Sequence, residues 1–128
     1  MPITVSLLEP QIIHQQWVGH ITIEDLQKVT SDIAALMQQH GYTHETPLVS
    51  IIDGADGKTL EMNIRMLTEI AHHEAREVGI YIINPPYIGR VLVKIVGVVV
   101  QNKELRVCTG MQQALQFARL QLEAVARA

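Results

Sequence analysis

The chain has 128 residues with a formal net charge of −3, and 48% of its residues are hydrophobic while 18% are charged. This length and composition predict one folded domain over residues 1–128 with its own core, and they exclude a disordered chain. The acidic balance, without any run of Lys or Arg, argues against a general nucleic-acid-binding protein, which needs a basic face for the phosphates.

The first two predicted elements form a β-hairpin. Residues 3–8 partly alternate apolar and polar side chains, as a half-buried strand does, and residues 12–18 indicate a second strand. Pro10 lies in the connection between them and favours a tight turn. Because the connection is short, we predict that the two strands pair antiparallel.

A first helix is predicted to begin at Thr22, whose hydroxyl can accept a hydrogen bond from an N–H group of the first turn. Glu24 and Asp25 suit the positive end of the helix dipole. Gly41 is expected to end the helix in a left-handed conformation. The helix has one apolar face, at spacings of three and four, formed by Leu26, Val29, Ile33, Leu36 and Met37.

The middle of the chain alternates strands with a second helix. Residues 47–52 predict a strand, and residues 53–58 predict an acidic, glycine-rich loop. The helix is expected to begin at Thr59 or a neighbour and to end before Gly79, with an inner stripe formed by Leu60, Ile64, Leu67 and Ala71. Residues 79–83 are nearly all apolar, which predicts a strand buried on both faces.

The last part of the chain contains one ambiguous segment. Residues 88–100 are rich in β-branched side chains, as a strand is, but their length and the spacing of Arg90 and Lys94 favour a third helix. Residues 104–108 predict a fifth strand. The segment Thr109-Gly110-Met111-Gln112 matches a capping box and predicts a last helix, whose apolar side is formed by Leu115, Ala118, Leu122 and Val125.

These elements follow the order ββαβαβαβα. Strands joined through helices pair in parallel, whereas the leading hairpin adds an antiparallel pair. We therefore predict an α/β fold with a five-stranded mixed sheet and four helices, in which all strands beyond the hairpin are parallel.

The cysteine content and the apolar segments indicate in which cellular compartment the protein is located. The single cysteine, Cys108, excludes a disulfide within the chain, which fits a reducing compartment. The first residues lack the charged and apolar regions of a signal peptide. The longest apolar stretch, residues 88–100, is too short and too charged to span a bilayer. We expect a cytoplasmic protein without a transmembrane segment.

The element order, the length and the strand Pro47–Ile52 feeding a loop and a helix give the chain a resemblance to the SpoIIAA-like family over nearly its whole length. These proteins are relatives of the STAS domain, which is named for sulphate transporters and anti-sigma factor antagonists. Other members are stand-alone bacterial domains, some of them compared with lipid-binding Sec14-type modules, and this chain looks more like that branch. The resemblance implies a SpoIIAA-like fold and a regulatory or interaction role.

In the anti-sigma antagonists of this family, the loop after the corresponding strand carries a phosphorylated serine, typically in an Asp-Ser-Ser-Gly-type motif. Residues 52–60 of this chain are Ile-Asp-Gly-Ala-Asp-Gly-Lys-Thr-Leu, so the loop contains no serine. Thr59 is the only hydroxyl near the matching place. The departure argues against a serine phospho-switch and leaves the loop as a binding surface.

The loop is therefore the candidate interaction site. At a helix N-terminus it could hold a partner or an anion, since a lysine adds positive charge and glycines allow close approach of the backbone. Its two aspartates instead favour a cation, and a turn held by local hydrogen bonds is the third interpretation. The candidate residues are Asp53, Gly54, Asp56, Gly57, Lys58 and Thr59.

The predicted third helix has apolar residues on two faces. One stripe can cover the sheet, and it consists of Ile88, Val91, Leu92, Ile95 and Val99. The second stripe needs another partner, which could be a second copy in a homodimer, an apolar ligand in a groove, or neighbouring helices of the monomer. This candidate face consists of Val93, Val96, Gly97 and Val100.

No catalytic, cofactor or metal motif stands out. The chain has no P-loop, dinucleotide fingerprint or nucleophile elbow. Glu69 and His73 are spaced by four, but metal sites need three or four convergent ligands, so we predict a solvated helix end. Cys108 precedes a helix, which can lower a thiol pKa, yet a buried structural role is more typical of a free cysteine.

These patterns predict a non-enzymatic regulatory or protein-interaction module that forms a homodimer and uses no cofactor and no metal. The alternative is a domain that binds a small apolar ligand or a lipid in a groove beside the third helix. An enzyme that uses Cys108 or the loop carboxylates is the third hypothesis.

Overall fold

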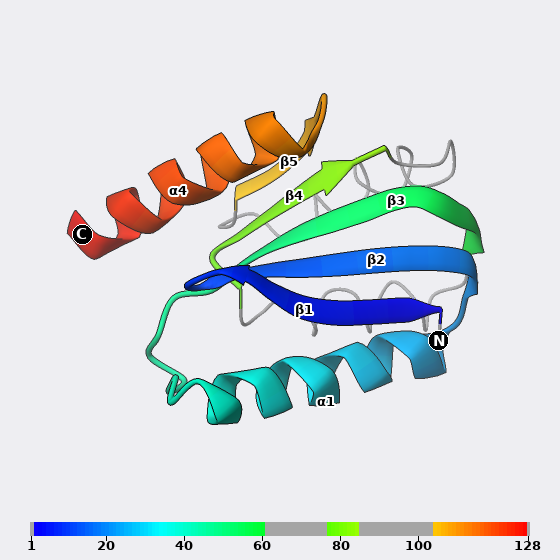
Figure 1. Cartoon of the computed structure of the whole chain (residues 1–128), viewed down its shortest axis with the longest axis horizontal. Helices are drawn as coiled ribbons and strands as arrows, with labels where there is room; N and C mark the ends of the chain where they lie inside the picture. Colours follow the sequence, from blue (N-terminus) through cyan, green and yellow to red (C-terminus); the bar gives the residue numbers. More distant parts are fainter. Residues whose placement is uncertain (1, 61–76, 85–103, 128) are drawn as a thin grey trace.

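The computed structural model describes residues 2–60, 77–84 and 104–127 of the chain. Within these ranges it contains five strands and two helices, which are labelled in Figure 1. They are β1 (Ile3–Glu9), β2 (Ile12–Ile21), α1 (Ile23–Gln39), β3 (Val49–Leu60), β4 (Gly79–Ile83), β5 (Glu104–Cys108) and α4 (Met111–Arg127).

The strands form one mixed sheet in the order β1-β2-β3-β4-β5. β1 and β2 pair antiparallel, and the pairs β2–β3, β3–β4 and β4–β5 are parallel. The predicted five-stranded sheet with an antiparallel leading hairpin is therefore confirmed. Strand order also leaves β1 and β5 as the two edges of the sheet.

Four helices were predicted, and the described ranges contain two, α1 and α4. The predicted second helix falls mainly on residues 61–76 and the third on residues 85–103, so both lie outside the described residues. The expected start of the second helix is wrong, because Thr59 and Leu60 belong to β3.

Two apolar clusters lie on opposite faces of the sheet. Successive residues of a strand point to opposite faces, and Ile12 and Ile13 of β2 belong to different clusters. The cluster with Ile13 packs against α1, through the buried helix residues Ile23, Leu26, Val29 and Ile33. The cluster with Ile12 packs against α4, through Ala114 and Ala118. We call the side with Ile13 the α1 face and the side with Ile12 the α4 face. In Figure 1, α1 lies next to β1, and α4 lies next to β4 and β5.

The predicted first helix is confirmed at both ends. Thr22 is its N-cap, and the Thr22 hydroxyl accepts from the Asp25 N–H at 3.3 Å while the Thr22 N–H donates to Asp25 Oδ2 at 2.8 Å. This reciprocal pair is a capping box that satisfies N–H groups at the helix start. Gly41 has φ +71°, the left-handed conformation expected beyond the helix end.

The sequence motif for the capping box of the last helix assigned the wrong glutamine, Gln112, to the contact with Thr109. The Thr109 N–H donates to Gln113 Oε1 at 2.8 Å, and Gln112 is exposed. The Ala114 N–H donates to the Gly110 carbonyl at 3.1 Å, so the first turn begins one residue later than the motif implied. The glutamine one turn into the helix therefore lies at position 113.

The segment predicted as a loop at residues 53–58 is part of β3, which continues to Leu60. β2 is also longer than the predicted residues 12–18 and ends at Ile21. Its last residues pair with the far half of β3, with Val18 opposite Asp56 and Ile21 opposite Leu60. Two register shifts interrupt this pairing, and Gly19 has φ +72° beside the second one.

Candidate functional site

The carboxyl end of β4 and the neighbouring middle part of β3 bring together two polar side chains. Asp53 of β3 lies opposite Ile83, the last residue of β4, so Asn84 follows just beyond the pair. Asp53 Oδ1 accepts from the Ala55 N–H at 2.9 Å and from Asn84 Nδ2 at 3.5 Å. Because the strands are parallel, both side chains lie at the same end of the sheet, where open α/β sheets bind ligands.

Both residues are held in place by the backbone around them. Asn84 has φ +50°, a left-handed conformation in which asparagine is enriched among non-glycine residues. Asp53 is half-buried, and Asn84 is exposed. The pair therefore presents an oriented carboxylate and an amide that a partner can reach.

The predicted interaction residues lie along a strand instead of around a loop. Gly54 is buried in β3, and Ala55 is exposed. The backbones of Asp56, Gly57 and Thr59 pair with β2. Together with Lys58 they belong to β3, which extends to residue 60, so they do not form a helix N-terminus at Thr59. The proposed anion site at a helix start is therefore wrong at this position.

Sequence reasoning missed Asn84 as a member of the site. The relevant signal was its place directly after a buried strand, because the residues after parallel neighbouring strands converge at one edge. The second predicted surface, Val93, Val96, Gly97 and Val100, lies outside the described residues.

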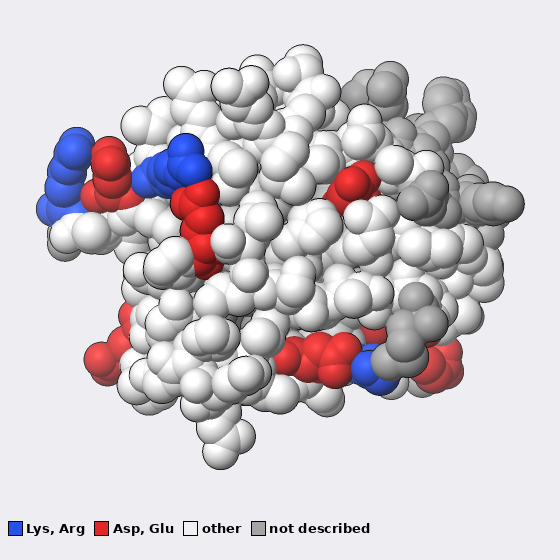
Figure 2. Space-filling model, in the orientation of Figure 1, with Lys and Arg blue, Asp and Glu red and all other residues white. Residues whose placement is uncertain are grey.

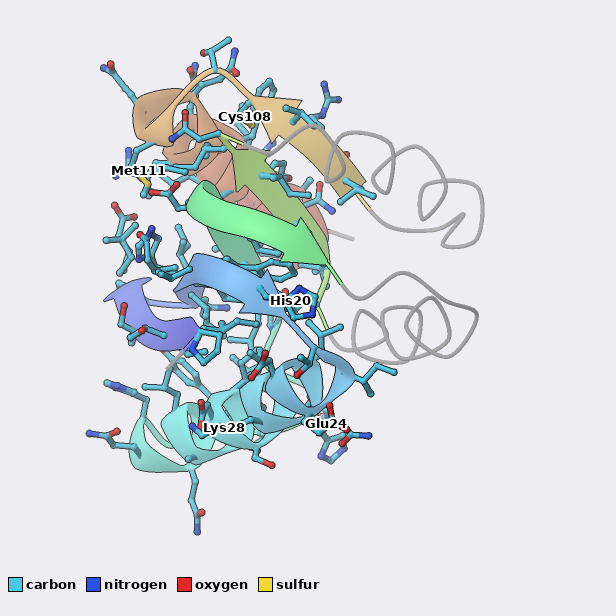
Figure 3. All side chains as sticks on the ribbon, turned by 90° about the vertical axis from the view of Figure 1, so that its right-hand side faces the viewer. His20, Glu24, Lys28, Cys108 and Met111 are labelled. Carbon is cyan, nitrogen blue, oxygen red and sulfur yellow. The ribbon has the colours of Figure 1, made fainter. Side chains whose placement is uncertain are left out.

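Asp53 offers hydrogen-bond acceptors and Asn84 offers a hydrogen-bond donor to a partner. Across residues 2–60, 77–84 and 104–127, no three metal-ligating side chains come together. His20 lies near the end of β2, and Glu24 and Lys28 lie on α1 (Figure 3). Lys28 Nζ contacts Asp32 Oδ2 at 3.0 Å, one turn along the helix. His72 and His73 lie outside the described residues.

Cys108 is a buried residue at the end of β5, beside the start of α4 and Met111 (Figure 3). Its side chain belongs to the apolar cluster of the α4 face. Burial raises the pKa of the Cys108 thiol above its ordinary value, although the nearby Arg106 opposes this shift. A raised pKa lowers the fraction of reactive thiolate. The predicted burial of Cys108 at a strand end is confirmed.

On the face that Figure 2 shows, surface charge is sparse over the sheet. In Figure 2, acidic and basic side chains lie side by side over the α4 end and along the α1 side, and the surface between them carries few charges. Among the described residues, no helix is long and apolar enough to cross a membrane.

Comparison with known proteins identifies the fold. No family model matches the sequence, and no curated protein matches it either. An uncharacterised DUF3478-family protein with a SpoIIAA-like fold from Shewanella loihica PV-4 is similar in structure, with a TM-score of 0.65 at 15% identity. That match covers 91% of this chain and 91% of the other.

Two structures of SpoIIAA itself are also similar. The unphosphorylated form of this anti-sigma factor antagonist has a TM-score of 0.60 at 10% identity, with 91% of this chain and 97% of that chain covered. The phosphorylated form, from Bacillus, has a TM-score of 0.54 at 12% identity, with 89% and 96% covered. At these identities the likeness shows the fold, and this chain has a SpoIIAA-like, STAS-type fold.

Proposed function

We propose that this protein is a non-enzymatic regulatory module that binds a protein partner at the carboxyl end of β4 and at Asp53 of the neighbouring β3. The single observation that carries the proposal is the Asp53–Asn84 pair on a SpoIIAA-like sheet. One of the similar structures is an anti-sigma factor antagonist, and the fold supports a comparable interaction role here. The buried, weakly acidic thiol of Cys108 supports a function without thiol catalysis.

The partner surface begins at Asp53 and Asn84 and continues along the second half of β3. Asp56, Gly57, Lys58 and Thr59 belong to this half of β3, whereas Gly54 is buried. Serine is absent from residues 52–60, which favours binding without a serine phospho-switch. A homodimer through Val93, Val96, Gly97 and Val100, or an apolar ligand beside them, stays a prediction for residues outside the described ranges.

Paired variants can test the proposed surface. The tagged wild-type protein and an Asp53→Ala/Asn84→Ala variant are expressed in the source cells, and bound proteins are quantified by mass spectrometry. Loss of a charge-assisted contact at an interface costs about 2 kcal/mol or more. We therefore expect the double variant to retain at least about tenfold less of a specific partner than the wild type.

Glu45→Ala is the matched control, because Glu45 is an exposed carboxylate in the loop before β3, at the opposite end of that strand. This control is expected to keep the partner. Circular dichroism must show that both variants fold as the wild type does. Equal retention of every partner by the wild type and the double variant would contradict the proposed surface.

A further inference from the structure

β1 is an edge strand with backbone groups that β2 does not use. The Val18 N–H donates to the Pro2 carbonyl at 2.7 Å, and Ile3 lies opposite Trp17. Hydrogen-bonded and non-bonded pairs alternate along an antiparallel ladder, so the N–H and C=O groups of Ile3, Val5 and Leu7 point away from β2. In the described part of the chain, no further strand lies beyond β1 to pair with them.

A hollow of about 330 Å³ runs beside this edge, between β1 and α1. Ile3 and Val5 line it from the strand, and Ala35 and Leu36 line it from the helix. Asp32 also reaches the hollow, but its carboxylate is paired with Lys28 of the same helix at 3.0 Å. Thr4 and Gln39 add polar groups to the lining, so the hollow offers both apolar and polar contacts to a chain that lies along β1.

The two edge strands, β1 and β5, differ in the charged side chains that discourage pairing with another chain. Natural edge strands often carry charges that discourage pairing with another chain. β5 has such charges, since Arg106 and Glu104 form an ion pair on it. Residues 3–8 of β1 contain no charged side chain, and Glu9 at its end is held by Arg119 of α4. Among the residues that the structure describes, the edge at β1 thus has neither a pairing strand nor charged side chains from Ile3 to Leu8.

We propose that β1 pairs antiparallel with β1 of a second copy of this chain, which makes one continuous sheet across a dimer. With Val5 opposite Val5 of the other copy, Ile3 meets Leu7 on the α1 face, beside the hollow. On the other face Thr4 meets Ser6, and both are exposed in the single chain. The strand is complementary to itself, as the surface of a twofold dimer must be.

This surface is separate from the candidate partner site and from the predicted face at residues 93–100. The dimer proposal does not depend on the proposed regulatory function. Either one can fail without the other.

Charge exchange at the exposed positions tests the pairing. In the proposed register, Thr4→Lys/Ser6→Lys places like charges directly opposite one another, and so does Thr4→Glu/Ser6→Glu. Like charges opposite each other destabilise a strand pair, and we expect each variant to dimerise about tenfold more weakly than the wild type, or worse. A mixture of the two variants should recover the dimer, because each lysine then faces a glutamate. Sedimentation velocity over a series of concentrations measures all three.

Amide hydrogen exchange on the wild type gives a second measurement that needs no variant. The N–H groups of Ile3, Val5 and Leu7 should exchange slowly in the dimer and faster on dilution, while those of Thr4 and Ser6 stay protected by β2. A wild-type protein that stays monomeric at every concentration overturns the proposal. Dimerisation of either charged variant alone as strong as that of the wild type also overturns the proposal. So does fast exchange of the Val5 amide in a dimer.

Discussion

Gly79 and Tyr81, two residues apart in β4, are in such close contact that a Cβ atom at Gly79 would lie 3.1 Å from the Tyr81 hydroxyl oxygen and 3.2 Å from a ring carbon. The ring is buried, and it stacks on Phe117 of α4 with a centroid distance of 6.0 Å. Burial is the main reason why the pKa of Tyr81 is raised. The missing side chain at Gly79 therefore makes room for the largest buried side chain of the α4 face.

Gly79→Ala should destabilise the protein, because the added methyl group forces the ring or the strand to move. Overpacking of a core typically costs about 1–3 kcal/mol in the free energy of unfolding. Urea denaturation followed by circular dichroism measures the loss. Gly79→Ala in a Tyr81→Phe background is the control, because that background lacks the hydroxyl oxygen nearest to the added Cβ. An equal loss in both backgrounds would mean that the contact with the Tyr81 hydroxyl is unimportant.

Thr22→Ala should remove the capping box of α1. The Asp25 N–H then loses the Thr22 hydroxyl, and we expect a loss of about 1 kcal/mol in unfolding free energy. Thr30→Ala provides the same substitution in the interior of α1, where alanine is the better helix former. Thermal denaturation should rank the Thr22 variant below the wild type and the Thr30 variant level with it or above. The reverse order would contradict the role of the cap.

Ser50→Ala should disturb a buried network of side-chain hydrogen bonds on the α1 face. Gln15 Nε2 donates to Ser50 Oγ at 3.3 Å, and Trp17 Nε1 donates to Gln15 Oε1 at 3.0 Å. Gln15 is 1% exposed and Ser50 0%, so water cannot replace the lost partner. An unsatisfied buried donor costs about 1–3 kcal/mol in unfolding free energy.

Unfolding of this Ser50 variant can be followed by the fluorescence of Trp17, the single tryptophan. A Ser50→Ala/Gln15→Leu variant should recover part of the stability, because it removes the stranded amide. Failure of the double variant to recover anything would argue that the loss at Ser50 has another origin.

Glu9→Gln should change how stability depends on pH. A hydrogen bond from Arg119 lowers the pKa of Glu9 below the ordinary 4.5, so the carboxylate form is favoured in the folded state. The stabilising effect is present above pH 4.5 and is lost as the pH falls through the lowered folded-state pKa.

Melting temperatures at neutral and acidic pH compare the wild type with this variant. The wild type should melt higher at neutral pH, and the difference should disappear in acid. Glu45→Gln removes the same charge from a loop and should show no such convergence. A constant difference between the wild type and the Glu9 variant at every pH would refute the prediction.

Local signals predicted much of this fold. The hairpin of β1 and β2, the start of α1 at Thr22 and the limits of β4 were readable because each depends on neighbours in the chain. The second half of β3 could not be predicted from local signals, since its aspartates and glycines are typical of turns. Those residues become a strand because β2, from Val18 to Ile21, supplies a pairing partner more than thirty residues away.

The sequence by itself determined the element order, the mixed sheet and the capped first helix, because these follow from periodicity and from contacts within a few residues. Only the tertiary structure decided which side chains meet. Asp53 and Asn84 are 31 residues apart and are joined only by the parallel register of β3 and β4. The open edge at β1 likewise depends on the strand order, since an edge exists only where pairing stops.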